Sequence, residues 1–259
     1  MQMHYINTGF HSGEWNMAFD VFLATQLQKK TILPTLRCYG WSPFALSLGY
    51  NQNDSFINKE KCRSENVSIV RRPTGGRAIY HSEEMTYSIV VFHQEKNISA
   101  LHNEISLALV EGVNMLGVNA VLSTESSSAT EMYKGKNSAA CFSSIARSEI
   151  QVNGKKIAGS AQRRFNDVVL QHGSVMLGDK HKQLPFFYKE HSEEFFMNLT
   201  HSTAEVNSLL HRQVSFEEAA AVIQQGFKKK WNVEFAEFPP VILEKFSEAE
   251  YYSATMLTQ

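Results

Sequence analysis

The chain has 259 residues, of which 43% are hydrophobic and 20% charged, a balance typical of a globular protein with a large core. Its 25 basic and 26 acidic residues argue against a general nucleic-acid-binding protein. No stretch approaches the ~20 apolar residues of a membrane span, and the first residues lack the pattern of a signal peptide. We expect one domain over residues 1–259, in the cytoplasm, without membrane or nucleic-acid partners.

In the first half of the chain, hydrophobic periodicity predicts two helices and several short strands. Apolar residues at helical spacing predict a helix from Glu14 to Lys30. A second helix carries apolar residues from Leu101 to Leu116 and should end near Gly117. Between these helices, short apolar runs interrupted by turn residues predict strands at 35–39, 45–48, 67–70 and 86–92.

The second half begins with a loop, then a hairpin, and ends in helices. Residues 123–148 are rich in Ser and Ala without periodicity, so we expect a long loop of the kind that is often functional. An Asn153-Gly154 type I′ turn should join strand 149–152 to the strand that begins at Lys155, with Gln151 opposite Lys156. The remaining expected elements are a strand at 168–177, a helix from the Ser215 capping box to Trp231, and a helix from Val241 to Tyr252.

The order of these elements indicates the fold class. Strands that follow one another directly in the sequence favour antiparallel or mixed pairing over a doubly wound parallel sheet. We therefore expect an α/β (α+β) fold in which helices flank a mixed, largely antiparallel sheet.

A glycine-containing loop, Arg71-Arg72-Pro73-Thr74-Gly75-Gly76-Arg77-Ala78-Ile79-Tyr80-His81, follows one of the expected strands. Adjacent glycines allow backbone N–H groups to approach a ligand closely. The loop lacks the Gly-Lys-Ser/Thr ending of a P-loop and is not a dinucleotide fingerprint. A tight turn flanked by solvated arginines is equally consistent with the residues alone.

A second candidate segment contains two lysines and three small residues. Lys155 and Lys156 should point to opposite faces of a strand, so that one is solvated and the other faces the interior or a cleft. Such lysines are often only edge-strand charges. The following Gly159-Ser160-Ala161 would permit close approach to a ligand.

The three cysteines are odd in number and follow no metal-ligand spacing, which favours reduced thiols and no metal site. Cys38 and Cys62 lie in apolar or helical patterns that suit buried thiols. Cys141 lies in the long polar loop and is the candidate nucleophile. A cation such as Lys156 would lower its pKa and bind a developing oxyanion, which suits acyl transfer through a thioester. His81 and His172 are further candidates for polar groups of the same cleft.

Several segments together resemble the family of lipoate–protein ligases and octanoyltransferases. The resemblance covers most of the chain in the family's order, through 16–20, 39–41, 48–52, 71–81, 156–161 and 170–174. It implies a biotin/lipoate–protein ligase-like fold. Within the family, Ala140-Cys141-Phe142 is similar to the cysteine-dependent octanoyltransferases of Gram-positive type.

The resemblance implies a specific reaction. Cys141 would take an octanoyl group from acyl carrier protein as a thioester, with Lys156 holding the oxyanion, and pass it to a lysine of a lipoyl domain such as the glycine-cleavage H protein. No metal and no nucleotide cofactor would be required. The substrate-binding residues it implies are Arg72, Thr74, Gly75, Gly76, Arg77, His81, Gly159, Ser160, Ala161 and His172.

Three alternatives remain open from the sequence. An ATP-dependent lipoate–protein ligase would use Lys156 to bind an adenylate phosphate and would not need Cys141. An amidotransferase between lipoyl domains would share the cysteine chemistry but take its acyl group from another donor. A non-catalytic carrier-protein-binding module would form no acyl adduct at all.

Overall fold

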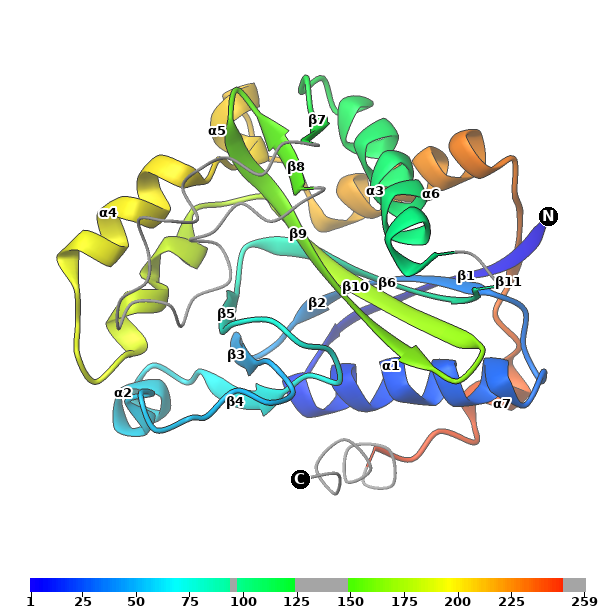
Figure 1. Ribbon diagram of the computed structural model, residues 1–259, viewed down its shortest axis with the longest axis horizontal. Coiled ribbons are helices and arrows are strands. Elements are labelled where there is room, and N and C mark those ends of the chain that lie inside the picture. The colour runs from blue at the N-terminus through cyan, green and yellow to red at the C-terminus, as the bar shows by residue number, and fades with distance from the viewer. Residues whose placement is uncertain (94–96, 124–148, 249–259) are drawn as a thin grey trace.

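The computed structural model describes residues 1–93, 97–123 and 149–248 (Figure 1). Within them, a large sheet has eight strands in the order β11-β1-β2-β6-β10-β9-β8-β7, and a small sheet has the order β4-β3-β5. The strands of the large sheet are β1 (Gln2–His11), β2 (Thr35–Trp41), β6 (Glu84–Phe92), β7 (Val121–Ser123), β8 (Glu149–Val152), β9 (Lys155–Phe165), β10 (Val168–Met176) and β11 (Glu234–Glu237). Those of the small sheet are β3 (Ala45–Leu48), β4 (Ser68–Arg71) and β5 (Ile79–His81).

The large sheet is mixed and largely antiparallel, as predicted. Strand β1 pairs in parallel with β2 and β11, whereas the pairs from β2 through β6, β10, β9 and β8 to β7 are antiparallel. The expected hairpin is also confirmed. Asn153 and Gly154 have φ of 51° and 76°, as a type I′ turn requires, and Gln151 is paired with Lys156.

Helices cover both faces of the large sheet (Figure 1). The helices of the described residues are α1 (Gly13–Gln28), α2 (Lys59–Ser64), α3 (Ile98–Asn114), α4 (Glu193–Ser202), α5 (Val206–Leu210), α6 (Phe216–Trp231), α7 (Pro240–Leu243) and a 3-10 helix, η3 (Lys180–Phe187). Helix α1 packs on one face over an aromatic cluster, and α3 and α6 pack on the other face over the main core. Among the described residues, none of the helices combines the length and apolar character needed to cross a membrane.

The last predicted helix, from Val241 to Tyr252, is confirmed only at its start, because α7 ends at Leu243 and residues 246 and 247 are not helical. The end of the predicted helix, residues 249–252, lies outside the described residues. After α7, Phe246 packs edge-on against the rings of Trp15 and Phe22, and burying this ring outweighs the local helical pattern. Strands β1 and β11 were also not expected from the sequence.

Helices α3 and α6 cross closely because each has a glycine at the contact. A Cβ on Gly226 would lie 2.4 Å from the Ala108 carbonyl oxygen and 2.5 Å from the Gly112 nitrogen. Both atoms belong to the backbone of α3, so they cannot rotate away as a flexible side chain could. The two glycines therefore set the spacing of the layer that covers this face of the sheet.

We predict that Gly226→Ala lowers the free energy of unfolding, because overpacking costs ~1–3 kcal/mol and alanine's better helix propensity returns only ~1 kcal/mol. Urea denaturation measures the difference. Gln225→Ala, at an exposed neighbouring position of α6, is the control and should change stability by less than ~0.5 kcal/mol. A Gly226→Ala protein as stable as the wild type would contradict the close crossing.

Candidate active site

A narrow pocket with a cavity volume of about 20 Å³ lies where α1 and four strands of the large sheet meet β5 and the loop between β4 and β5. Its lining residues are Met17, Tyr39, Trp41, Arg72, Ile79, His81, Thr86, Gly159, Ser160, Ala161, His172, Gly173 and Ser174. The residues from α1, β2 and β6 are buried, whereas the Gly159–Ala161 stretch of β9 is half-buried. The pocket therefore has a closed inner end of Met17 and aromatic rings, and a rim of small residues.

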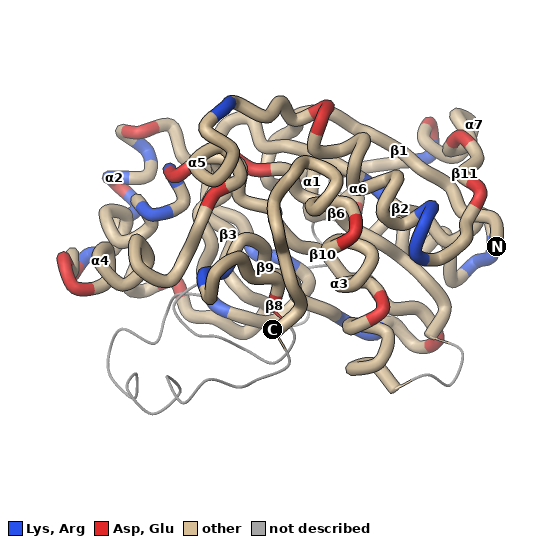
Figure 2. The backbone as a smooth tube through the Cα atoms, turned by 90° about the horizontal axis from the view of Figure 1, so that it is seen from above, with Lys and Arg blue, Asp and Glu red and all other residues tan. Residues whose placement is uncertain are grey.

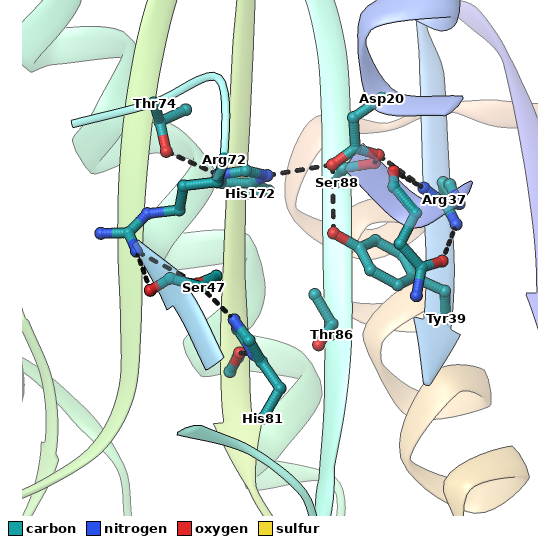
Figure 3. A network of polar contacts seen from close by, with 12 residues as sticks. Asp20, Arg37, Tyr39, Ser47, Arg72, Thr74, His81, Thr86, Ser88 and His172 are labelled. Carbon is teal, nitrogen blue, oxygen red and sulfur yellow. Dashed lines mark hydrogen bonds and ion pairs between the residues drawn. The ribbon is translucent and has the colours of Figure 1, made fainter. Parts of the chain in front are cut away.

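A buried polar network lies beside this pocket and centres on Asp20 of α1 (Figure 3). Asp20 and Arg37 have fully buried side chains and form an ion pair at 2.7 Å. The same carboxylate accepts hydrogen bonds from Ser88 at 2.7 Å and Tyr39 at 3.0 Å, and contacts His172 Nδ1 at 2.9 Å. One carboxylate thus connects α1 to β2, β6 and β10.

The network fixes the protonation of its members. Burial by itself would raise the pKa of Asp20, but the Arg37 charge and the hydrogen bonds from His172 and Ser88 hold that pKa below its ordinary value. Burial lowers the pKa of His172 against the opposing attraction of Asp20. A neutral His172 that donates from Nδ1 to Asp20 accepts at Nε2 from the Thr74 hydroxyl, 2.6 Å away.

A second network surrounds His81 on the other side of the pocket. Its Nδ1 lies 2.7 Å from Glu84, its Nε2 lies 2.7 Å from the Ser47 hydroxyl, and its ring stacks on Trp41 at 3.9 Å. Burial would raise the pKa of Glu84, but His81 and hydrogen bonds from the Thr86 and Ser174 hydroxyls hold it below its ordinary value. The polar groups at this wall therefore have fixed partners within the protein.

Arginines hold the glycine loop through its backbone. Arg72 donates to the carbonyl oxygens of Gly75 at 2.9 Å and Arg77 at 2.8 Å, and Arg163 donates to that of Pro73 at 3.0 Å. These arginines therefore form defined hydrogen bonds within the protein, whereas the alternative interpretation expected solvated arginines. Gly76 has φ of 99°, a conformation that favours glycine.

Glycines also permit the close approach of neighbouring strands at the rim. A Cβ on Gly173 would lie 2.2 Å from the carbonyl oxygen of Gly159 and 2.8 Å from the Ser160 hydroxyl. There is therefore no room for a side chain at position 173, where β9 and β10 line the pocket, and any larger residue there would displace the rim.

The two lysines of the β9 segment separate as predicted. Lys155 is exposed, whereas Lys156 is 3% exposed, and its ammonium contacts Glu149 at 2.5 Å. The Glu149 side chain is 8% exposed, so the pair is buried on both sides. Charges in such a position require a partner, since desolvation is expensive.

The Lys156 side chain leans toward the pocket. Its Cα is opposite Gln151, yet its ammonium reaches Glu149, two residues or ~7 Å further along β8. Ile150, the residue after Glu149, is paired with Ala158 of β9. Glu149 therefore lies beside the start of the pocket rim at Gly159, and the Lys156 side chain extends toward that rim. Strands β8 and β9 lie side by side in both views (Figures 1 and 2). Lys156 thus points along the strand toward the rim without forming part of the pocket wall.

The cysteines of the described residues are not nucleophiles. Burial raises the pKa of Cys38 to about 12 and that of Cys62 to about 11, so both remain thiols at neutral pH. The predicted nucleophile, Cys141, lies outside the described residues. Within the described part of the chain, no group of three His, Cys, Asp or Glu side chains could hold a metal ion.

The structure brings most of the predicted substrate-binding residues to one pocket. Six of them line it: Arg72, His81, Gly159, Ser160, Ala161 and His172. Thr74 contacts His172, and the loop at 75–77 is held by Arg72, outside the lining of this pocket. Sequence reasoning missed the roles of Asp20, Arg37 and Glu84. The available signal was a carboxylate within the apolar face of α1, next to Phe19.

We predict that Asp20→Asn destabilises the protein by about 3–5 kcal/mol, because Arg37 would remain buried without a counter-charge. Chemical denaturation measures the loss. Asp54→Asn is the matched control, since Asp54 pairs with Lys59 at the same 2.7 Å but is 43% exposed. The control should cost less than ~0.5 kcal/mol. Equal losses in the two variants would contradict the role of burial.

We also predict a pH dependence of stability that arises from His172. Because its folded-state pKa lies below the ordinary 6.5, the unfolded chain binds this proton more readily. The contribution of the buried, neutral His172 to the free energy of unfolding is complete above pH 6.5 and is lost as the pH falls through and below that value. Thermal unfolding from about pH 8 to about pH 5 should show a smaller fall for His172→Asn than for the wild type. Parallel curves would contradict this assignment.

Comparison with known proteins identifies the family. A family model of the lipoyl protein ligase A/B catalytic domain matches residues 12–228. The chain is 35% identical over 239 residues to octanoyltransferase LipM of Bacillus subtilis (strain 168), across 88% of this chain and 86% of that protein. It is 34% identical, in an alignment 261 positions long, to octanoyltransferase LipM of Clostridioides difficile (strain 630), across 97% of this chain and 95% of that protein.

Solved structures agree on the fold. A crystal structure of lipoate-protein ligase A bound with ATP has a TM-score of 0.78 at 18% identity, over 98% of this chain and 95% of that one. A putative lipoate protein ligase from T. acidophilum with bound lipoic acid has a TM-score of 0.76 at 19% identity, over 98% and 96%. The family expected from the sequence is confirmed, and the chain belongs to the lipoyl protein ligase A/B catalytic domain family.

Proposed function

We propose that this protein is an octanoyltransferase of lipoate biosynthesis that moves an octanoyl group from acyl carrier protein to a lysine of a lipoyl domain through a thioester on Cys141. Its similarity to octanoyltransferases LipM supports the acyltransferase class. The observation that carries the proposal is the buried ammonium of Lys156, which leans along β9 toward the rim of the pocket.

The apolar lining of the pocket suits a short aliphatic chain, which would widen a cavity that measures about 20 Å³ in this structure. Met17, Tyr39, Trp41 and Ile79 offer apolar surface, and the polar groups beside them already have partners within the protein. Each buried methylene contributes ~0.8 kcal/mol, so an octanoyl tail gains several kcal/mol from this pocket. The acyl carbonyl would then lie at the rim of small residues around Gly159.

In the first half-reaction, the Cys141 thiolate attacks the thioester carbonyl of octanoyl-acyl carrier protein. Lys156 favours the thiolate and binds the oxyanion of the tetrahedral intermediate. Collapse of the intermediate releases the carrier thiol and leaves octanoyl on the cysteine.

In the second half-reaction, the ε-amino group of a lipoyl-domain lysine attacks the acyl-enzyme and forms an amide. The glycine-cleavage H protein is the acceptor we propose to test first. Transfer in two steps requires ping-pong kinetics, with the carrier leaving before the acceptor reacts.

We predict that octanoyl-acyl carrier protein, without ATP, adds one octanoyl mass to the protein and that peptide mapping locates it at Cys141. Cys141→Ala should abolish the adduct. Lys156→Ala should slow its formation by ~10²–10³-fold, the usual effect of removing one oxyanion donor. Lys155→Ala, the exposed neighbour, is the matched control and should react at the wild-type rate.

Other outcomes would support the alternative functions. A requirement for ATP, with full activity in Cys141→Ser, would indicate a lipoate–protein ligase. An adduct formed from an acylated lipoyl domain but not from acyl carrier protein would indicate an amidotransferase. The absence of any adduct on any residue would indicate a non-catalytic module.

A further inference from the structure

Glu149, the first residue of β8, has one carboxylate oxygen without a hydrogen-bond partner among the described residues. Its Oε1 contacts the Lys156 ammonium at 2.5 Å, and its Oε2 is buried. The side chain is 8% exposed, so water reaches it poorly. A buried carboxylate oxygen without a donor is costly, and such an atom calls for an explanation.

The contrast with Asp20 indicates that Glu149 is not built as a purely structural counter-ion. Both oxygens of Asp20 are occupied, one by Arg37 and Ser88 and the other by Tyr39 and His172. A carboxylate that serves only to neutralise a buried cation gains stability from such saturation. Glu149 instead keeps one strong acceptor site available beside the cation.

We propose that Glu149 is the general base of the second half-reaction, where its Oε2 receives the ε-ammonium of the acceptor lysine and removes a proton from it. This inference rests on the proposed function, which puts the acyl carbonyl at Lys156. The acceptor's ε-ammonium is a cation with three N–H donors, so it matches a buried, anionic acceptor in charge and in hydrogen bonding.

Distances permit this role. A hydrogen bond from the Lys156 ammonium to the oxyanion would span ~2.7–2.9 Å. Added to the 2.5 Å between this ammonium and Glu149 Oε1, it places the carboxylate within about 5.5 Å of the oxyanion. An amine that bonds to Glu149 therefore lies within reach of the acyl carbon. Glu149 is also the first residue of β8, and this end of β8 lies beside the part of β9 that forms the pocket rim.

The protons balance in this scheme. The acceptor lysine arrives as an ammonium with three protons. Glu149 takes one, which frees the nitrogen lone pair to attack the acyl carbon. The C–N bond forms, the C–S bond breaks, the second proton passes to the departing cysteine sulfur, and the third remains on the amide nitrogen. Glu149 then returns its proton to solvent, so no co-reactant is needed.

The test measures the rates of the two half-reactions separately in the full-length Glu149→Gln variant. We expect acyl-enzyme formation from octanoyl-acyl carrier protein to slow by no more than about tenfold, whereas transfer to the lipoyl domain slows by ~10²–10⁴-fold, as for loss of a general base. The acyl-enzyme should therefore accumulate in rapid-quench intact-mass measurements. Hydroxylamine, which is already deprotonated at neutral pH, should cleave the accumulated thioester at the wild-type rate.

Glu205→Gln is the matched control, because Glu205 is also a buried carboxylate and pairs with Lys182 at 2.6 Å. Its ratio of transfer rate to acylation rate should equal that of the wild type. Equal slowing of both half-reactions in Glu149→Gln would assign Glu149 to positioning Lys156 and overturn the base. Unchanged transfer would overturn it as well. A wild-type protein that forms no adduct would instead contradict the proposed function itself.

Discussion

The buried ion pair between Asp20 and Arg37 determines how the pocket can be built. Two fully buried charges are tolerated only when they are paired and when their remaining hydrogen-bonding groups are satisfied. The partners come from α1 and β2, and the groups that complete the carboxylate come from β6 and β10. All four elements must therefore reach their positions together. The pocket lies among the same elements, so this network holds its lining elements in place relative to one another.

Further buried pairs surround the pocket, His81 with Glu84 and Lys156 with Glu149. Each brings a basic and an acidic group together and holds strong dipoles fixed in place. Fixed dipoles of this kind need no reorganisation when charge develops in a transition state. The arrangement suits a reaction in which an uncharged acyl group becomes an oxyanion for a short time. Along the chain as a whole, basic and acidic residues are interspersed among the helices and strands (Figure 2).

Local signals predicted the elements whose sequences carry them: the apolar periodicity of α1, the Asn153-Gly154 turn, and the Ser215 cap of α6. Strands β1 and β11 depend on parallel pairing between distant segments, which no local pattern encodes. The glycine loop and the separation of Lys155 from Lys156 could be predicted from composition and alternation. The polar networks could not, because their members are distant in sequence and each would be unfavourable if buried alone.

The hydrogen bonds that arginines donate to the backbone of the glycine loop have a consequence for protein engineering. Arg71 donates to the carbonyl oxygens of Gly49, Tyr50 and Gln52, in the same manner as Arg72 and Arg163 donate to the loop. Every residue has a backbone carbonyl oxygen, so these hydrogen bonds from arginine depend on the path of the backbone and not on the side chains of the loop. Transplanting residues 73–77 into another scaffold would therefore not transfer their conformation unless the neighbouring Arg72 and the distant Arg163 were transplanted with them.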